Sequence, residues 1–213
     1  MVKTIRAGNS LKNPFQKVNV QLVNLGEGLP EGGDWIWELK YDGYRIVAFA
    51  EGDSVRLITR GGMDYTKRFS AVADSINGWS KGRAFVLDGE MIVADENGRS
   101  DFSALQNFSS MPQTERLVFM VFDVLALDGQ DLRGMELLER KKILKTLMKG
   151  APSNIKQSIY RTGDALKLFD AVCSMNFEGL IGKLGNSTYM GKRNQTWIKY
   201  KCKNYRRRAG KEV

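Results

Sequence analysis

The sequence of 213 residues contains no histidine. This absence excludes Ser-His-Asp and Cys-His nucleophile systems, and it excludes metal sites that depend on imidazole ligands. Any acid, base or metal chemistry in this chain must therefore use carboxylates and lysines.

Cysteine is scarce, and long apolar runs are missing. Cys173 and Cys202 lie far apart without the spacing of a metal site, which argues against a disulfide framework and a structural zinc. No segment approaches the roughly 18 apolar residues of a membrane span, and residues 1–15 lack the apolar stretch of a secretory signal. We therefore expect a cytoplasmic monomer without a membrane partner.

Acidic residues are outnumbered, with 24 Asp and Glu against 33 Lys and Arg and a net charge of +9. The excess gathers in residues 183–213, where lysines and arginines alternate with aromatic residues such as Trp197 and Tyr200. A charge run often forms only a solvated surface, but cations interleaved with aromatic side chains suit a phosphate backbone better. The composition favours a nucleic-acid partner.

The apolar pattern predicts one α+β domain with mainly antiparallel sheets. Strands are expected at 35–39, 44–50, 54–59, 117–127, 179–184 and 196–202, with a strand pair or one bent strand over 84–94. Helices are expected at 66–76, with Thr66 as N-cap, and at 101–108, 136–148 and around 165–172. Residues 1–13 would be a loose arm, 14–25 a short helix or strand, 191–194 a loop, and 203–213 a basic tail.

Lys40 stands out within the sequence ELKYDGYR of residues 38–45. The strands at 35–39 and 44–50 would form a hairpin with Asp42-Gly43 as its turn, and a lysine carried into a pocket on that hairpin is placed to act as a nucleophile. The alternative is a solvated lysine beside an ordinary Asp-Gly turn. Lys183 follows two glycines, but the spacing is wrong for a Walker loop and Leu184 stands where Ser or Thr is needed. Side-chain cations would have to hold any nucleotide phosphates.

Six segments taken together resemble the covalent nucleotidyltransferases and, among them, the ATP-dependent DNA ligases. They are ELKYDGYR (38–45), TRGGMDYTKRF (59–69), LDGE (87–90), VFDVLALDGQDLRGMELLERK (121–141), FEGLIGK (177–183) and WIKYKCK (197–203). The pair Tyr44-Arg45 and the segment ending in LLERK are most similar to the ligase modules of bacterial end-joining enzymes.

This resemblance implies a role for each site residue. Lys40 would attack the α-phosphate of ATP, expel pyrophosphate and carry AMP, which then passes to the 5′-phosphate of nicked duplex DNA before sealing to the 3′-OH. The implied nucleotide and phosphate contacts are Glu38 to the adenine edge, Phe122 to its face, Arg45 and Glu90 to the ribose and neighbouring groups, Lys199 and Lys201 to the α-phosphate, Arg60 to the nucleic-acid phosphate, and Lys183 to the nucleotide. Glu178, with Glu90, would bind Mg²⁺ or Mn²⁺.

Elementary chemistry is consistent with these implied roles. A lysine attacks as the neutral amine, which neighbouring cations and a divalent metal favour. Mg²⁺ prefers carboxylate oxygens, which Glu178, Glu90 and Asp88 can provide. For Asp42, Asp88 and Asp123 a structural role and a functional one both stay open.

The departure from the family is at the end of the chain. DNA ligases usually continue into an OB-fold domain, but only 12 residues (213 − 201) follow Lys201, too few for a five-stranded barrel. The chain would thus be an excised adenylation domain, its OB-fold removed or on a separate partner, or a natural minimal form. Two other functions stay open: an RNA ligase or GTP-using capping enzyme, and a catalytically silent nucleic-acid-binding module.

Overall fold

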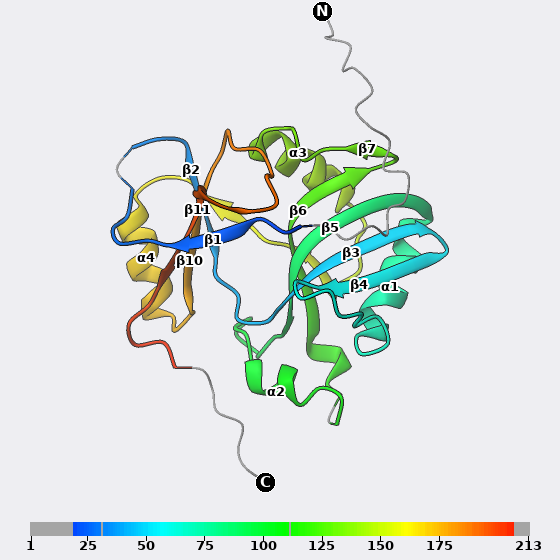
Figure 1. The fold of residues 1–213 in the computed structure, drawn as a ribbon. Coiled ribbons are helices and arrows are strands. Elements are labelled where there is room, and N and C mark those ends of the chain that lie inside the picture. Colours follow the sequence, from blue (N-terminus) through cyan, green and yellow to red (C-terminus); the bar gives the residue numbers. More distant parts are fainter. Residues whose placement is uncertain (1–18, 31, 111, 207–213) are drawn as a thin grey trace, which may run out of the picture.

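The computed structural model describes residues 19–30, 32–110 and 112–206, and these fold into two sheets with flanking helices (Figure 1). The five-stranded sheet has the order β1 (Leu22–Leu25), β11 (Arg193–Lys201), β10 (Gly179–Leu184), β2 (Trp35–Leu39) and β9 (Tyr160–Arg161). The six-stranded sheet has the order β4 (Ser54–Thr59), β3 (Tyr44–Gly52), β5 (Gly82–Val93), β6 (Leu117–Leu127) and β7 (Gln130–Asp131), with β8 (Ile155–Gln157) paired to β6.

Pairing is antiparallel except between β1 and β11 and between β6 and β8. The helices are α1 (Ser70–Ser80), α2 (Phe102–Gln106), α3 (Leu137–Leu147) and α4 (Ala165–Ser174), with a 3₁₀ turn at Thr114–Arg116. The predicted α+β class with mainly antiparallel sheets is confirmed. Within the described residues, none of the helices is long and apolar enough to cross a membrane.

The predicted hairpin between residues 35–39 and 44–50 is wrong. Both strands exist, but β2 pairs with β10 and β9 in one sheet, whereas β3 pairs with β4 and β5 in the other. Gly43 serves a close approach and not a hairpin turn, because a Cβ there would lie 2.1 Å from the carbonyl oxygen of Met91. Lys40 therefore lies on the connection between the two sheets.

Other local predictions need correction. For residues 84–94 the alternative of one strand is confirmed, because β5 spans Gly82–Val93. The alternative of a hairpin turn at Asp88-Gly89 is wrong, because this pair lies at an irregularity in the pairing of β5 with β6. The first long helix begins at Ser70 and not at Thr66. Thr66 is not its N-cap, because the hydroxyl of Thr66 accepts a hydrogen bond from the backbone N–H of Leu57 at 2.9 Å. Residues 191–194 are not all loop, because β11 begins at Arg193. Strands β7, β8 and β9 are too short to leave a periodic signal.

The expectation that the two cysteines form no disulfide is also wrong. Cys173 of α4 and Cys202, directly after β11, form a disulfide although they are 29 residues apart in sequence. They meet because α4 packs on the five-stranded sheet, where its side chains join a cluster with Trp37, Leu180 and Tyr200. Figure 1 shows α4 beside β2, β10 and β11.

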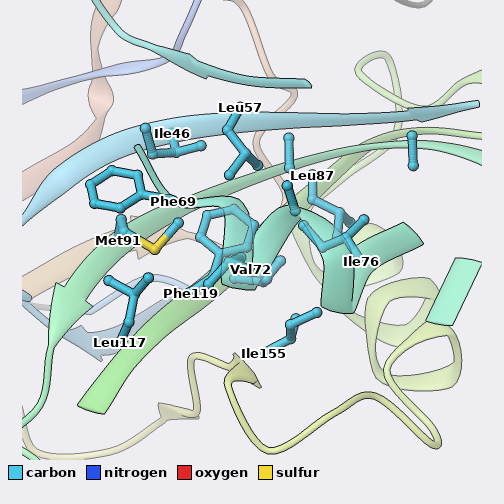
Figure 2. Close-up of a cluster of buried hydrophobic side chains, with 14 of the residues drawn as sticks. Ile46, Leu57, Phe69, Val72, Ile76, Leu87, Met91, Leu117, Phe119 and Ile155 are labelled. Carbon is cyan, nitrogen blue, oxygen red and sulfur yellow. The ribbon is translucent and has the colours of Figure 1, made fainter. Parts of the chain in front are cut away.

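The main core fills the space between the six-stranded sheet and its helices. Strand alternation directs Ile46, Leu87 and Phe119 toward α1, where they meet Val72 and Ile76 (Figure 2). A second cluster lies between the two sheets and includes Val47, Phe49, Val86 and Phe122 from the opposite face of the same strands. The expected arm at 1–13 and the last residues of the basic tail, 207–213, lie outside the described residues.

Candidate active site

A cavity of about 240 Å³ lies between the two sheets. Its lining from the five-stranded sheet and adjoining residues consists of Leu22, Val23, Glu38, Leu39, Lys40, Tyr41, Ile181, Lys183, Arg193, Trp197 and Lys199, and its lining from the other sheet consists of Arg45, Arg60, Glu90 and Phe122. Eight of the ten predicted site residues thus face one cavity, and the remaining two, Glu178 and Lys201, form ion pairs next to Lys40.

Lys40 is held where β2 leaves the five-stranded sheet. Its backbone N–H donates to the carbonyl of Gly179 at 2.9 Å, and its ammonium forms an ion pair with the carboxylate of Glu178. The other oxygen of Glu178 lies 3.2 Å from Nζ of Lys201. Gly179 permits this arrangement, because a Cβ there would lie 1.9 Å from the carbonyl oxygen of Tyr200 on β11. The predicted nucleophile, metal ligand and phosphate contact are therefore direct neighbours.

Glu38 is almost fully buried beneath the cavity and is surrounded by donors. Its Oε1 lies 2.6 Å from Nζ of Lys141 and 3.0 Å from Nζ of Lys183, while Oε2 accepts a hydrogen bond from the hydroxyl of Ser158 at 2.9 Å. Burial raises the pKa of Glu38, but the charges of Lys141 and Lys183 outweigh it and hold the pKa below its ordinary value. Burial lowers the pKa of Lys183 to about 8, although Glu38 acts in the opposite direction. Glu38 is thus an ionised acceptor.

Arg45 is fixed by a buried carboxylate. Its Nε and one terminal nitrogen each donate to Asp88 at 2.6 Å, and the hydroxyl of Tyr189 donates to the same carboxylate at 2.6 Å. Asp88 is fully buried and does not line the cavity. Its role is therefore to orient Arg45, which leaves Glu178 and Glu90 as the carboxylates that interact with Lys40.

Two cationic side chains, those of Lys183 and Arg45, lie over aromatic rings of the cavity. The ammonium of Lys183 lies 4.3 Å from the ring centroid of Phe122 and 4.1 Å from that of Trp197. The guanidinium of Arg45 lies 4.6 Å from the centroid of Phe122. Such contacts stabilise a cation by about 0.5–2 kcal/mol. Positive charge is thus concentrated where an aromatic base and a phosphate would both find partners.

Glu90 of β5 faces the same cavity. Burial chiefly raises its pKa to about 7; Arg45 and Lys40 act against this shift, while Asp88 and Glu178 add to it. Among the described residues, no side chain forms an ion pair or hydrogen bond with Glu90. A half-buried carboxylate without its own cation suits a hard divalent metal. The described residues nevertheless hold no group of three or more acidic or cysteine side chains close enough to bind a metal, so a metal here would also need oxygens from its substrate.

Lys199 and Arg60 complete the basic lining. Burial lowers the pKa of Lys199, and the positive charges of Lys201 and Lys40 lower it further. Arg60 is exposed at the end of β4, with its backbone N–H bonded to the carbonyl of Arg45 at 3.2 Å. The two cations reach the cavity from opposite sheets.

The remaining aspartates have structural positions. Asp123 forms a two-point ion pair with Arg140 at 2.8 Å, and both side chains are fully buried. Asp42 is buried outside the cavity and its carboxylate accepts a hydrogen bond from the hydroxyl of Tyr205 at 3.3 Å. For both residues the structural role is favoured over a direct one in the cavity.

The residues that hold the buried carboxylates Glu38 and Asp88 in place include three that had not been predicted: Lys141, Ser158 and Tyr189. The sequence pattern could have indicated Lys141, because this residue lies on the apolar stripe of α3 between Leu137 and Leu144, where a charged side chain needs a buried partner. Ser158 and Tyr189 had none, because both lie in connections whose course depends on the tertiary fold.

Two mainly antiparallel sheets that enclose a lysine and a basic cavity form the fold of a covalent nucleotidyltransferase. The chain belongs to the ATP-dependent DNA ligase domain family, whose model matches residues 11–201. It is 38% identical over 183 residues to the multifunctional non-homologous end joining protein LigD of Pseudomonas aeruginosa, and the match covers 85% of this chain and 22% of that protein. It is 32% identical over 193 residues to the prophage-derived DNA ligase-like protein LigB of Bacillus subtilis, which covers 90% of this chain and 64% of that protein.

Solved structures agree with the sequence comparisons. The mycobacterial DNA ligase D complexed with ATP and MES is similar with a TM-score of 0.74 and 31% identity, over 86% of this chain and 60% of that one. The ligase domain of LigD from M. tuberculosis gives a TM-score of 0.71 and 30% identity over the same shares. The predicted resemblance to ligase modules of bacterial end-joining enzymes is confirmed. The chain spans less than two thirds of the length of each of these four proteins.

Proposed function

We propose that this chain catalyses nucleotidyl transfer from ATP to the 5′-phosphate of a DNA nick through a covalent lysyl-AMP at Lys40. The observation that carries the proposal is the position of Lys40, which lies in a cavity with an ionised acceptor at Glu38 and the cations Arg45, Lys183 and Lys199. The Nζ of Lys40 forms a bond to the α-phosphorus while the bond to the β-phosphate oxygen breaks and pyrophosphate leaves. Lys40 must first give up a proton.

The surrounding residues divide into base, ribose and phosphate contacts. Glu38 and Phe122 would recognise the adenine, Arg45 and Glu90 the ribose, and Lys183, Lys199 and Lys201 the phosphates. Phosphoryl transfer requires mainly positioning and charge stabilisation, which fixed cations supply. Arg60, exposed at the rim, would contact a phosphate of the nucleic acid.

A divalent metal ion fits this site. Among the described residues, Glu90 forms no ion pair. The negative charge of Glu178 is close enough to raise the pKa of Glu90. These two carboxylates would hold Mg²⁺ or Mn²⁺, which supplies additional positive charge to the phosphates when bound. The ion pairs of Glu178 with Lys40 and Lys201 keep the carboxylate oriented toward the reacting amine.

DNA would bind along the exposed cations of and beyond β11. Lys192, Arg193, Lys201, Lys203 and Arg206 are exposed and continue from the cavity toward the basic tail. Contacts of this kind are independent of base sequence, and each phosphate contact that is lost should lower the log-log salt slope by about one. We further propose that the chain acts as a cytoplasmic monomer and that an OB-fold domain, on the same or another polypeptide, completes the grip on the duplex.

The first experiment is adenylation of the purified chain with ATP and Mg²⁺, followed by mass spectrometry. The wild type should gain one AMP, and Lys40→Ala should gain none. Lys142→Ala is the matched control, because Lys142 is an exposed lysine that is paired with Glu139 at 2.7 Å and does not line the cavity. Labelling by GTP or NAD but not by ATP would overturn the proposal, as would equal labelling of Lys40→Ala.

A second experiment separates the steps of ligation. The chain should seal a pre-adenylated nick faster than it completes the cycle from ATP on an unadenylated nick, because an OB-fold motif serves chiefly the first step in the ligases that this chain resembles. Both rates are measured at two salt concentrations, with and without residues 204–213. Equal rates on the two nicks, or binding indifferent to salt and to the deletion, would contradict these roles. An RNA ligase would instead prefer nicked RNA, and a silent binding module would show neither activity.

A further inference from the structure

Lys141 is a buried cation that does not line the cavity. It belongs to α3, its side chain is 2% exposed, and its ammonium lies 2.6 Å from Oε1 of Glu38. Helix α3 contributes Leu137 and Leu144 to the clusters of the six-stranded sheet, whereas Glu38 belongs to β2 of the other sheet. The ion pair therefore connects Glu38, which belongs to the five-stranded sheet, to a helix that packs against the six-stranded sheet.

Glu38 has more positive partners than its charge requires. Two ammonium groups, from Lys141 and Lys183, share one carboxylate oxygen, so the three groups carry two positive charges and one negative. A buried cation costs several kcal/mol unless it is well paired, and Lys183 alone would neutralise Glu38. Lys183 faces the cavity and Lys141 does not. The second lysine thus leaves Lys183 available to a ligand while Glu38 stays ionised.

The fixed carboxylate has a defined chemical preference. An ionised carboxylate accepts hydrogen bonds and donates none. Adenine presents an amino donor at the position where guanine presents the acceptor O6. Ser158 holds the other oxygen of Glu38, so the carboxylate cannot rotate freely. A base amino group would find an acceptor here, whereas a carbonyl oxygen would meet a like partial charge.

We infer that Lys141 is a positioning residue that sets the preference of the site for ATP over GTP, by holding Glu38 as an oriented, ionised acceptor for the amino group of the base. This inference rests on the proposed function, since it requires a purine nucleotide in the cavity. Lys141 acts through Glu38 and touches no reacting atom.

Removal of the Lys141 charge has two consequences at Glu38. Lys183 becomes the single counter-ion and is drawn toward the carboxylate, away from the ligand. Burial of Glu38 is then less well compensated, which favours its protonated form, and a protonated carboxyl can donate to a carbonyl oxygen. Both changes weaken ATP binding and reduce discrimination against GTP, while Lys40 and Glu178 keep their geometry.

The test compares Lys141→Met with Lys141→Arg and with the matched surface control Lys142→Met in the full chain. For each, adenylation rates are measured over a range of ATP and GTP concentrations, and thermal unfolding verifies the fold. We expect Lys141→Met to raise the half-saturating ATP concentration and to lower the ATP-to-GTP preference, each by about tenfold or more, with a change of less than about threefold in the maximal rate. Lys141→Arg should restore most of the preference, and Lys142→Met should behave as wild type.

A double-mutant cycle gives an independent measurement that does not depend on the stability of a single variant. If Lys141 acts through Glu38, then Glu38→Gln combined with Lys141→Met should lose little more ATP preference than Glu38→Gln alone. Additive losses would overturn the inference. So would an unchanged ATP-to-GTP preference in Lys141→Met, or a loss confined to the maximal rate.

The outcomes also distinguish this inference from the proposed function. If the wild type fails to label with ATP, the proposed function fails. If the wild type labels on Lys40 but Lys141→Met keeps its full preference for ATP, only the role of Lys141 fails, and the buried lysine serves the fold alone.

Discussion

The two faces of the six-stranded sheet are built from the same strands but differ in chemistry. The face toward α1 presents apolar side chains such as Ile46, Leu87 and Met91. The face toward the other sheet presents Arg45 and Asp88, which alternate with them along β3 and β5. Because successive residues of a strand point to opposite faces, one strand supplies both a core and a site. Stability and chemistry should therefore respond to different substitutions.

The largest effect is expected at the cleft between the sheets. Glu178→Ala removes a proposed metal ligand and the partner of Lys40 and Lys201. Adenylation should fall by about 100-fold or more, and more Mg²⁺ should be needed, because charge stabilisation of the reacting phosphate is lost. Rates measured across a Mg²⁺ titration check this. Unchanged metal dependence would place the metal elsewhere, with Glu90 as the first candidate.

The ion pair between Arg45 and Asp88 on the cleft face should be costly to break for stability. Arg45→Met leaves the fully buried Asp88 with Tyr189 as its hydrogen-bond donor, and we expect a loss of about 3–5 kcal/mol in the free energy of unfolding. The exposed pair of Arg83 and Asp128, 2.7 Å apart, is the control, and Arg83→Met should cost less than about 1 kcal/mol. Urea unfolding measures both. Similar losses in the two variants would contradict the difference in burial.

On the face of the sheet toward α1, a substitution should change stability but not ATP binding. Leu87→Ala should lower the free energy of unfolding by about 2–5 kcal/mol, because Leu87 is fully buried in the main core. Below its unfolding temperature the variant should keep the half-saturating ATP concentration of the wild type within about twofold. The measurements are urea unfolding and ATP titration. A large change in ATP affinity with little change in stability would show that the two faces are not independent.

The disulfide between Cys173 and Cys202 gives a smaller expected effect. It fastens α4 to the residue that follows Lys201, and it closes a loop of 29 residues. Replacing both cysteines with serine should lower the free energy of unfolding by about 2–4 kcal/mol under oxidising conditions. Under a thiol reductant the wild type and the variant should differ little. A difference that persists in the reduced state would assign the loss to packing instead of to the cross-link.

The sequence predicted the longer strands but not how the first of them, β2 and β3, pair. The strands at 35–39, 44–52 and 117–127 follow from apolar runs. The partner of β2, however, is β10, far along the chain, and nothing in the local pattern of Asp42-Gly43 separates a hairpin turn from a crossing between two sheets. Gly43 is required by the nearby carbonyl of Met91, which is a tertiary fact.

Local sequence patterns were equally incomplete for the site: they predicted residues that line the cavity but not the contacts that hold them. Residues within the recognisable segments, such as Glu38, Arg45 and Lys199, do meet in one cavity. Their partners Ser158 and Tyr189 lie in connections without a periodic signal. The register of β3 against β5 places Arg45 opposite Glu90, so the ion pair of Arg45 with Asp88 became evident only from the side-chain contacts. Sequence patterns thus indicated the groups that meet a ligand better than the groups that hold them in place.

We propose Lys40 as the nucleophile of a cavity that contains two further lysines, Lys183 and Lys199. The most direct test is to adenylate the wild type with ATP and Mg²⁺, digest it under conditions that preserve the phosphoramidate, and map the AMP by tandem mass spectrometry. We expect AMP on Lys40 and on neither Lys183 nor Lys199. AMP on Lys183 or Lys199, with Lys40 unmodified, would contradict it.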